Sequence, residues 1–275
     1  MRVETLSDHP GKLLNEATQR RVAEMAAADV ARKKAVARVA KLRERRAAAL
    51  AKGRLLAWFG LWFEVSRAKK QVPRFRSIAG SAPTGEEQAS RAGKRAEDEV
   101  AAELGEQLND DWLLFRGYRN GKGEIDHVLV GPGGVVAVEV KNVNATVTID
   151  GDVWDAVKVG NYGEVFDRPP LEDARGRTPS VQLNEPADAL AAFLEKFGQP
   201  VDVERVVLMV HPKARVARHT RPTVVVGTSV DAVLGRFGGR LGRARRAEIE
   251  RLIRRDHKFH EQRRARLRGL RCACR

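Results

Sequence analysis

Cysteine is scarce in this chain of 275 residues, which limits the kinds of site that it can build. The two cysteines, Cys272 and Cys274, lie one residue apart and have no matching pair of histidines in the sequence. They therefore supply neither a zinc site nor a framework of disulfides. Such sparing use of cysteine suits a reducing compartment, so we expect a cytoplasmic protein.

Long apolar runs are also missing. The most apolar segment, Leu55–Val65, covers about 11 residues, well short of the roughly 20 that cross a bilayer. Residues 1–15 have no apolar core of the kind that a secretory signal needs. The sequence Gly-x-x-x-x-Gly-Lys-Ser/Thr does not occur either, so a phosphate-loop ATPase is unsupported. From the sequence we expect neither a membrane-spanning helix nor a secretory leader.

Positive charge is abundant but unevenly distributed, within a formal net charge of +15. Residues 93–235 hold 16 Lys/Arg against 23 Asp/Glu, whereas residues 1–53, 54–92 and 236–275 have net charges of +7, +4 and +11. This asymmetry predicts basic arms that hold a polyanion around an acidic centre, and nucleic acid is the natural candidate. The solvated helices of an arginine-rich protein would give the same balance, so charge alone does not separate the two interpretations.

The most informative stretch is a predicted β-hairpin in the middle of the chain. Two apolar runs, Ile125–Val130 and Val135–Val140, flank the turn sequence Gly131-Pro132-Gly133-Gly134. In a hairpin with this turn, Val130 faces Val135. Both strands are apolar on both faces, which is typical of the middle of a covered sheet.

Three charged residues interrupt these apolar strands. Counting outward from the turn puts Asp126 opposite Glu139, with Cβ atoms roughly 4.5–5.5 Å apart, close enough for both carboxylates to hold one cation. Lys141 shares the face of Glu139 because side chains alternate along a strand. His127 points to the other face, as expected of a core histidine. Buried carboxylates are costly unless they are paired or bind a metal, so the pattern predicts a metal-dependent phosphodiesterase site, with a structural ion-pair network as the alternative.

These residues resemble the NERD family, the nuclease-related domain, which belongs with the restriction-endonuclease-like PD-(D/E)xK nucleases. Asp126 matches the acidic residue that precedes the motif's Glu-x-Lys, and Glu139-Val140-Lys141 matches the Glu-x-Lys itself. The resemblance covers about residues 85–230. It implies an α/β fold, a restriction-endonuclease-like core with a central mixed sheet flanked by helices, here with basic helical extensions at both ends.

The resemblance also implies two further site residues. A helical Glu often precedes the motif, and Glu97 matches it beside an apolar helical stripe, where we expect it to point inward at the end of its helix. The family also tends to carry a Gln at the start of a later helix after Asn-Pro. Here Thr178-Pro179-Ser180-Val181-Gln182 has Thr in place of that Asn. The implied catalytic set is Asp126, Glu139, Lys141, Glu97 and Gln182.

The hairpin and the resemblance together predict hydrolysis of nucleic acid, with DNA as the expected substrate. Asp126, Glu139 and the carbonyl of Val140 would bind Mg²⁺ or Mn²⁺, hard cations that prefer oxygen ligands. The metal would polarise a phosphate oxygen and lower the pKa of a bound water, which Lys141 and Gln182 would position. Two other hypotheses stay open: a non-catalytic nucleic-acid-binding module on the same fold, and a membrane-peripheral scaffold.

Composition divides the chain into four segments. Residues 1–67 form a basic helical arm, which could pack, form a loose homodimer or bind phosphate. Within it the aromatic segment 55–65 favours docking on the parent domain or a partner, with contact to a membrane surface as the alternative. Residues 68–84 form a linker, residues 85–235 the nuclease core, and residues 236–275 a basic C-terminal helix and tail.

Within the core we expect alternating helices and strands, beginning with a helix opened by a capping box of Thr84 and Glu87. A loop rich in Gly, Pro and charge at residues 158–177 is placed to border a substrate groove. The remaining expected elements are strands at 112–118, 146–149, 153–156, 205–211 and 222–227, and helices at 11–52, 180–197 and 243–271.

Overall fold

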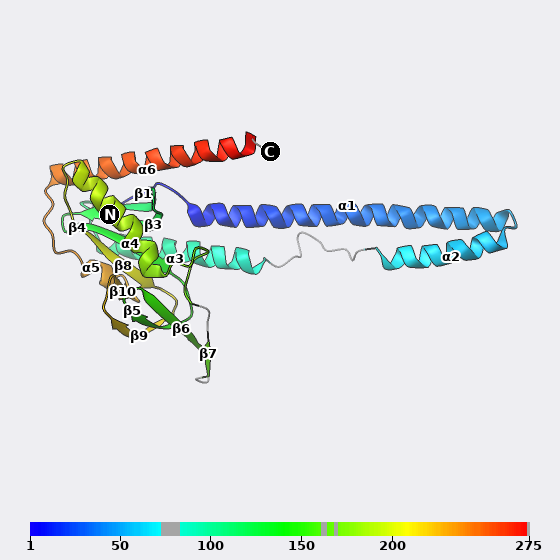
Figure 1. The fold of residues 1–275 in the computed structure, drawn as a ribbon, viewed down its shortest axis with the longest axis horizontal. Coiled ribbons are helices and arrows are strands. Elements are labelled where there is room, and N and C mark those ends of the chain that lie inside the picture. Colours follow the sequence, from blue (N-terminus) through cyan, green and yellow to red (C-terminus); the bar gives the residue numbers. More distant parts are fainter. Residues whose placement is uncertain (73–82, 161–163, 168–169, 274–275) are drawn as a thin grey trace. The chain divides into compact units, whose positions relative to one another are not determined.

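The computed structural model describes residues 1–72, 83–160, 164–167 and 170–273, of which residues 9, 10 and 268–273 are described by their backbone alone (Figure 1). The chain divides into two compact units. One comprises Met1–Gly11 with Arg91–Arg275, and we call it the core unit. The other comprises Lys12–Ser90, and we call it the arm unit.

The core unit is built on a mixed sheet of six strands. In spatial order these are β1 (Arg2–Thr5), β2 (Leu113–Arg119), β3 (Glu124–Gly131), β4 (Gly134–Lys141), β8 (Val203–Met209) and β10 (Val225–Gly227). β2, β3 and β4 are antiparallel neighbours, whereas β1, β8 and β10 each run parallel to the strand beside them. This is the mixed α/β architecture that the sequence predicts.

A second, smaller sheet packs into the same unit. Its order is β7 (Val165–Asp167), β6 (Val153–Val159), β5 (Thr146–Asp150) and β9 (Arg215–Thr220). The expected hairpin of β5 and β6 is present, and β9 and β7 are additions that the sequence analysis did not predict. Apolar side chains of β5 and β6, including the buried Trp154, join the main core.

Helices cover both faces of the large sheet, which is why its strands are apolar on both faces. On one face lie α4 (Pro179–Lys196), which packs against β3, β4 and β8, and α6 (Arg243–Ala273), which packs against β2 and β3 (Figure 1). On the other face lie α3 (Gly85–Gln107) and the short α5 (Asp231–Leu234). Alternation along β8 divides its residues between the two cores, with Val207 on the α4 side and Val206 on the α3 side.

The first half of α6 belongs to the core, which corrects its description as a basic extension. Ile249, Leu252 and Ile253 are fully buried. The Tyr118 hydroxyl donates a hydrogen bond to Asp256 (2.5 Å). These three apolar residues follow a helical stripe, but the +11 charge of residues 236–275 hides the stripe in the sequence.

The strand β1 was also missed, because residues 1–67 were assigned to the arm. β1 pairs in parallel with β2 along the register Arg2 to Leu113. The chain then passes so close to β2 that a Cβ at Gly117 would lie 2.1 Å from the carbonyl oxygen of Ser7. Gly117 also has φ +68, a conformation that favours glycine. Glycine is therefore required here both by the close approach of Ser7 and by the positive φ.

The arm unit contains α1 (His9–Ala51) and α2 (Leu55–Lys70). The two helices pack through the buried side chains of Val39, Leu42, Val65 and Ala68. α2 extends to Lys70, beyond the start expected for the linker, and residues 73–82 of that linker lie outside the described residues. In the described parts of the chain, no helix is both long and apolar enough to cross a membrane.

The predicted capping box is present at the start of α3. The backbone N–H of Thr84 donates to Glu87 Oε2 (2.8 Å), and the N–H of Glu87 donates to Thr84 Oγ1 (3.2 Å). The two residues thus satisfy each other's free donors at the helix N-terminus.

The packing of α6 gives a testable difference between two leucines on one helix. Replacing buried Leu252 by Ala should lower the free energy of unfolding by about 2–5 kcal/mol, because it leaves a cavity under the sheet. Leu267 on the same helix is 53% exposed, so Leu267→Ala should change the stability by less than about 0.5 kcal/mol. Urea unfolding of the two variants measures the difference, and equal losses would contradict the core role of α6.

Candidate active site

The β3–β4 hairpin has the register that the sequence predicts. Val130 pairs with Val135, and the ladder runs from Gly131–Gly134 to His127–Val138. Beyond this ladder the backbone N–H of Val140 donates to a side chain, Oδ2 of Asp126 (2.8 Å), instead of to a backbone carbonyl of β3. The end of the hairpin therefore holds Asp126 in line with β4, beside Glu139.

Glu139, Lys141 and Gln182 form one hydrogen-bonded chain. Lys141 Nζ donates to Glu139 Oε1 (2.6 Å) and to Gln182 Oε1 (2.8 Å). The Glu139 side chain is 8% exposed and that of Lys141 is 22% exposed, so the pair lies at the edge of the core. With Asp126 beside Glu139, the structure thus brings together four of the five predicted catalytic residues.

Gln182 is oriented by the loop that precedes α4. Pro179 occupies the first turn of the helix, where a missing N–H costs nothing, and the N–H of Gln182 donates to the carbonyl of Thr178 (2.8 Å). The side-chain Nε2 of Gln182 donates to the carbonyl of Arg177 (2.6 Å). Because its amide N is committed to Arg177, the amide O faces Lys141. Thr in place of Asn does not prevent this placement.

The electrostatics of the site are set first by burial and then by repulsion between carboxylates. Burial, together with the charges of Glu139 and Glu97, raises the pKa of Asp126 well above its ordinary value, against the opposing effects of Lys141 and the Val140 N–H. Burial also disfavours the charge on Lys141, but Glu139 and Asp126 outweigh it and raise the Lys141 pKa above its ordinary value. Lys141 is therefore an ammonium ion at neutral pH.

Glu97 lies in the middle of α3 rather than at its end, which corrects the expected position. Burial raises its pKa to about 7, with Arg116 opposing the shift and Glu139 adding to it. Glu97 thus senses the charges of the site. The carbonyl of Glu97 also lies 3.2 Å from Nε2 of His127, which is fully buried on the α3 side as expected of a core histidine.

The oxygen donors of the site suit a hard metal ion only in part. Among the residues that the structure describes, no three His, Cys, Asp or Glu side chains are grouped closely enough to hold a metal ion by themselves. Glu97 therefore does not complete a three-carboxylate site. Mg²⁺, however, is usually held by one or two carboxylates and completes its shell with water and substrate phosphate. Asp126 and Glu139, with the carbonyl of Val140 between Glu139 and Lys141, fit that pattern.

The repulsion between the carboxylates of Asp126 and Glu139 supports the binding of a metal ion between them. Hydrogen bonds occupy Oδ2 of Asp126 and Oε1 of Glu139, and no described residue donates to the second oxygen of either carboxylate. A cation between the two carboxylates would offset the repulsion that adds to the effect of burial on the Asp126 pKa.

Sequence reasoning missed the residues that support Gln182. Arg177 is held by Asp173 through Nε (2.9 Å) and Nη2 (2.7 Å), and by Glu185 through Nη1 (3.0 Å). These residues lie in or next to the loop that was expected to border a groove. Asp173 before Gly176 is a turn signal that could have pointed to a structured loop.

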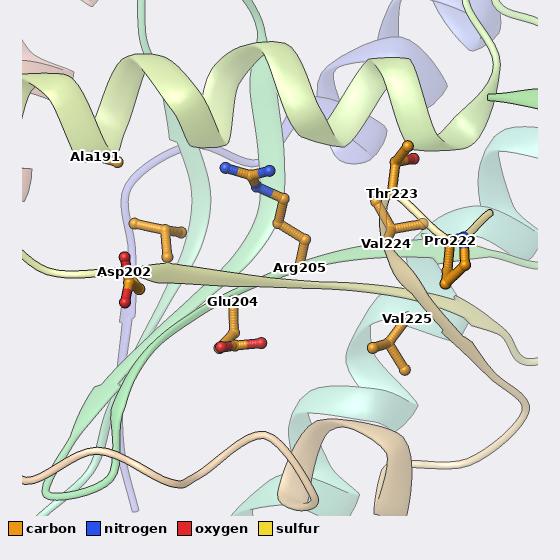
Figure 2. Close-up of a pocket in the computed structure, with 9 residues that line it drawn as sticks. Ala191, Asp202, Glu204, Arg205, Pro222, Thr223, Val224 and Val225 are labelled. Atoms are coloured by element: carbon orange, nitrogen blue, oxygen red, sulfur yellow. The ribbon is translucent and has the colours of Figure 1, made fainter. Parts of the chain in front are cut away.

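The core unit also has a pocket away from these residues, and its charged side chains do not converge as those of the candidate active site do. It has a volume of ≈ 380 Å³ and lies between α4, β8 and residues 222–225 (Figure 2). Arg205 points toward α4, where it pairs with Asp188, whereas Glu204 points to the opposite side of β8. Neighbouring residues of a strand face opposite sides, so these two charges cannot converge on one ligand.

A mixed α/β core that joins an acidic residue and a Glu-x-Lys on neighbouring strands is a nuclease-like core. Residues 92–210 match the model of the NERD family, the nuclease-related domain. This match confirms the resemblance seen in the hairpin. The matched stretch includes Glu97, both hairpin strands and Gln182. Comparison with curated proteins and with solved structures gave no match.

The shifted pKa of Glu97 predicts a pH dependence of stability. Its folded-state pKa of about 7 lies above the ordinary 4.5, so between these values the folded protein holds a proton that the unfolded chain has lost. Stability should therefore fall as the pH rises from 4.5 to 7. In EDTA, Glu97→Gln should remove part of this fall and be up to about 3 kcal/mol more stable than wild type above pH 7.

The matched control is Glu103→Gln, which changes an exposed glutamate on the same helix. Chemical unfolding at a series of pH values compares the three proteins. The control should follow the wild-type profile, and a Glu97→Gln profile parallel to wild type would show that Glu97 carries no raised pKa.

Proposed function

We propose that this protein is a metal-dependent nuclease that hydrolyses phosphodiester bonds of nucleic acid, with DNA as the expected substrate. The observation that carries the proposal is the meeting of Asp126, Glu139 and Lys141 at the open end of one hairpin. It is supported by the nuclease-related domain that contains all three residues. A purely structural ion-pair network would not leave Asp126 without a cationic hydrogen-bond partner, since its carboxylate is bonded to a backbone N–H.

Each residue has a role that its contacts suggest. Asp126, Glu139 and the Val140 carbonyl would hold Mg²⁺ or Mn²⁺, which supplies Lewis-acid polarisation of a phosphate oxygen and an acidic water. Lys141 would place its ammonium beside the phosphate and offset the charge that develops there. Gln182 would orient Lys141 through the 2.8 Å hydrogen bond. Glu97 would act on the site through its charge rather than as a metal ligand.

The isosteric variant Asp126→Asn tests the proposal most directly. It keeps a side-chain oxygen for the N–H of Val140 but removes the negative charge that would bind the metal. Cleavage should fall by about 10²-fold or more, whereas the melting temperature in EDTA should be unchanged or higher, because a buried repulsion is removed. Supercoiled, linear and single-stranded DNA and RNA, each with Mg²⁺, Mn²⁺ or EDTA, make up the assay.

Two further variants complete that experiment. Asp155→Asn removes an exposed carboxylate from β6 and should cut like wild type. Lys141→Ala should lose cleavage as well, but it leaves Glu139 buried without its cation, so its melting temperature must be measured beside its activity. Wild-type protein that stays inert on every substrate with both metals overturns the proposal. Binding without cutting, unaffected by Asp126→Ala, would identify a nucleic-acid-binding module instead.

One feature of the arm unit favours a second property, attachment to an anionic membrane surface. The apolar side chains of α2 are largely exposed: Leu56 is 90% exposed, Phe63 64% and Phe59 58%. Cations lie on both sides of them in the sequence, at Lys52, Arg54, Arg67, Lys69 and Lys70. An exposed apolar helical segment with cations at both of its ends suits a helix that lies in a lipid interface.

The double variant Phe59→Ser/Phe63→Ser tests this attachment. Co-flotation with vesicles that contain an anionic lipid should be reduced several-fold, because the apolar area available for insertion is lost. The matched control, Phe166→Ser/Phe259→Ser, removes two phenylalanines of the core unit that are 53% and 59% exposed and should float like wild type. Wild-type protein that does not float with anionic vesicles excludes membrane attachment.

A further inference from the structure

A second hollow in the core unit, which we call the basic pocket, has an unusual lining. It has a volume of ≈ 380 Å³ and is formed by the β2–β3 turn, the loop before α4, and α6. Of the described residues that line it, one is a carboxylate, Glu124, and none is aromatic. Five are cations: Arg119, Lys122, Arg175, Arg177 and Arg264.

The wall formed by the β2–β3 turn is rigid. Asn120, which is 8% exposed, donates through Nδ2 to the carbonyl of Pro186 in α4 (2.8 Å). Its Oδ1 accepts the N–H groups of Lys122 (2.9 Å) and Gly123 (3.3 Å). The turn is thus held against α4 by one side chain, and Lys122 projects from a fixed backbone.

Four of the five cations divide into a paired and an unpaired group. Arg119 pairs with Glu124 and Glu261, and Arg177 pairs with Asp173 and Glu185, so both are fixed in place and largely neutralised. Lys122 and Arg175 are exposed. Neither has an ion-pair partner among the residues that the structure describes. They therefore leave the pocket with positive charge that a ligand can use.

The basic pocket is joined to the candidate active site through one residue. The Arg177 side chain lines the pocket, while its carbonyl accepts the hydrogen bond from Gln182 Nε2 (2.6 Å). The same Gln182 accepts the hydrogen bond from Lys141. A ligand held by the Arg177 side chain is therefore connected to Lys141 through a single residue, Gln182.

We propose that the basic pocket binds a phosphate group of the same nucleic-acid strand that is cut at Asp126 and Glu139. This inference rests on the proposed function and adds a second phosphate subsite to it. Guanidinium groups match the geometry of phosphate oxygens, whereas the absence of aromatic side chains among the described lining residues gives a base no stacking surface. The pocket holds the strand by its backbone, so binding there is independent of sequence.

The test measures binding without cleavage. A single-stranded oligonucleotide of roughly 12 nucleotides, labelled with fluorescein at its 3′ end, is titrated with the full chain in EDTA at several salt concentrations, and anisotropy reports binding. Lys122→Ala/Arg175→Ala should weaken binding about 10-fold and make the salt dependence shallower by about 1–2 in slope. Both side chains are exposed, so the melting temperature should not change.

The control is Lys158→Ala/Arg218→Ala, which removes one exposed lysine and one exposed arginine from the smaller sheet. It should bind like wild type. Oligonucleotides with a 5′-hydroxyl or a 5′-phosphate separate two sources of the phosphate. A loss confined to the phosphorylated strand identifies a terminal phosphate, and an equal loss on both identifies an internal phosphodiester.

The inference fails if the pocket variant binds like wild type, or if the control variant loses as much affinity. Its failure is distinct from that of the proposed nuclease. Pocket-dependent binding by a protein that never cuts supports the subsite and rejects the catalysis. Metal-dependent cutting with binding unchanged in the pocket variant supports the catalysis and rejects the subsite.

Discussion

The repulsion between Asp126 and Glu139 at the end of one hairpin is the constraint around which the core unit is arranged. Two carboxylates on neighbouring strands destabilise a covered sheet unless something positive stands between or beside them. Lys141 supplies a positive charge, but its ammonium is bonded to Glu139 rather than to Asp126. Asp126 is left with a neutral donor, the N–H of Val140, and its pKa is raised. The folded state is thus less stable than its packing allows, in the place where a divalent cation would restore the balance.

Keeping these charges in register requires a sheet covered on both faces. β4 lies between antiparallel β3 and parallel β8, so its backbone is fixed on both sides. α4 reaches this region because it connects back to β8, and its first turn then delivers Gln182 to Lys141. Arg177, just before α4, fixes the other end of the Gln182 amide. The geometry of the site therefore depends on the β4–β8 pairing and on where α4 begins, and not on the hairpin alone.

Local signals in the sequence were enough to predict the hairpin, its register and the capping box at Thr84. Alternation along strands and the Gly-rich turn depend on neighbouring residues, so a single sequence carries them. The pairing of β1 with β2 could not be predicted, because it joins residues more than a hundred positions apart and leaves only four residues as a signal. The core role of α6 was obscured for a different reason: three buried apolar residues are embedded in an arginine-rich helix. Gln182 could be placed only through the family resemblance, since nothing in the local pattern points from α4 to Lys141.

The position of α6 also changes how the charge of the chain should be interpreted. Residues 93–235 alone have a net charge of −7, which suggested an acidic centre gripped by separate basic arms. With α6 and β1 included, the core unit holds 33 Lys/Arg against 29 Asp/Glu, a net charge of +4. The unit that contains the carboxylates is therefore itself net positive rather than acidic, although the other +11 of the chain's charge lies in the arm unit. Under the proposed function, a nucleic acid drawn to this net positive unit would reach the carboxylates at the end of the hairpin, where Lys141 already stands beside Glu139. In the proposed nuclease, the cations that would attract the substrate and the carboxylates that repel each other thus belong to a single folded unit.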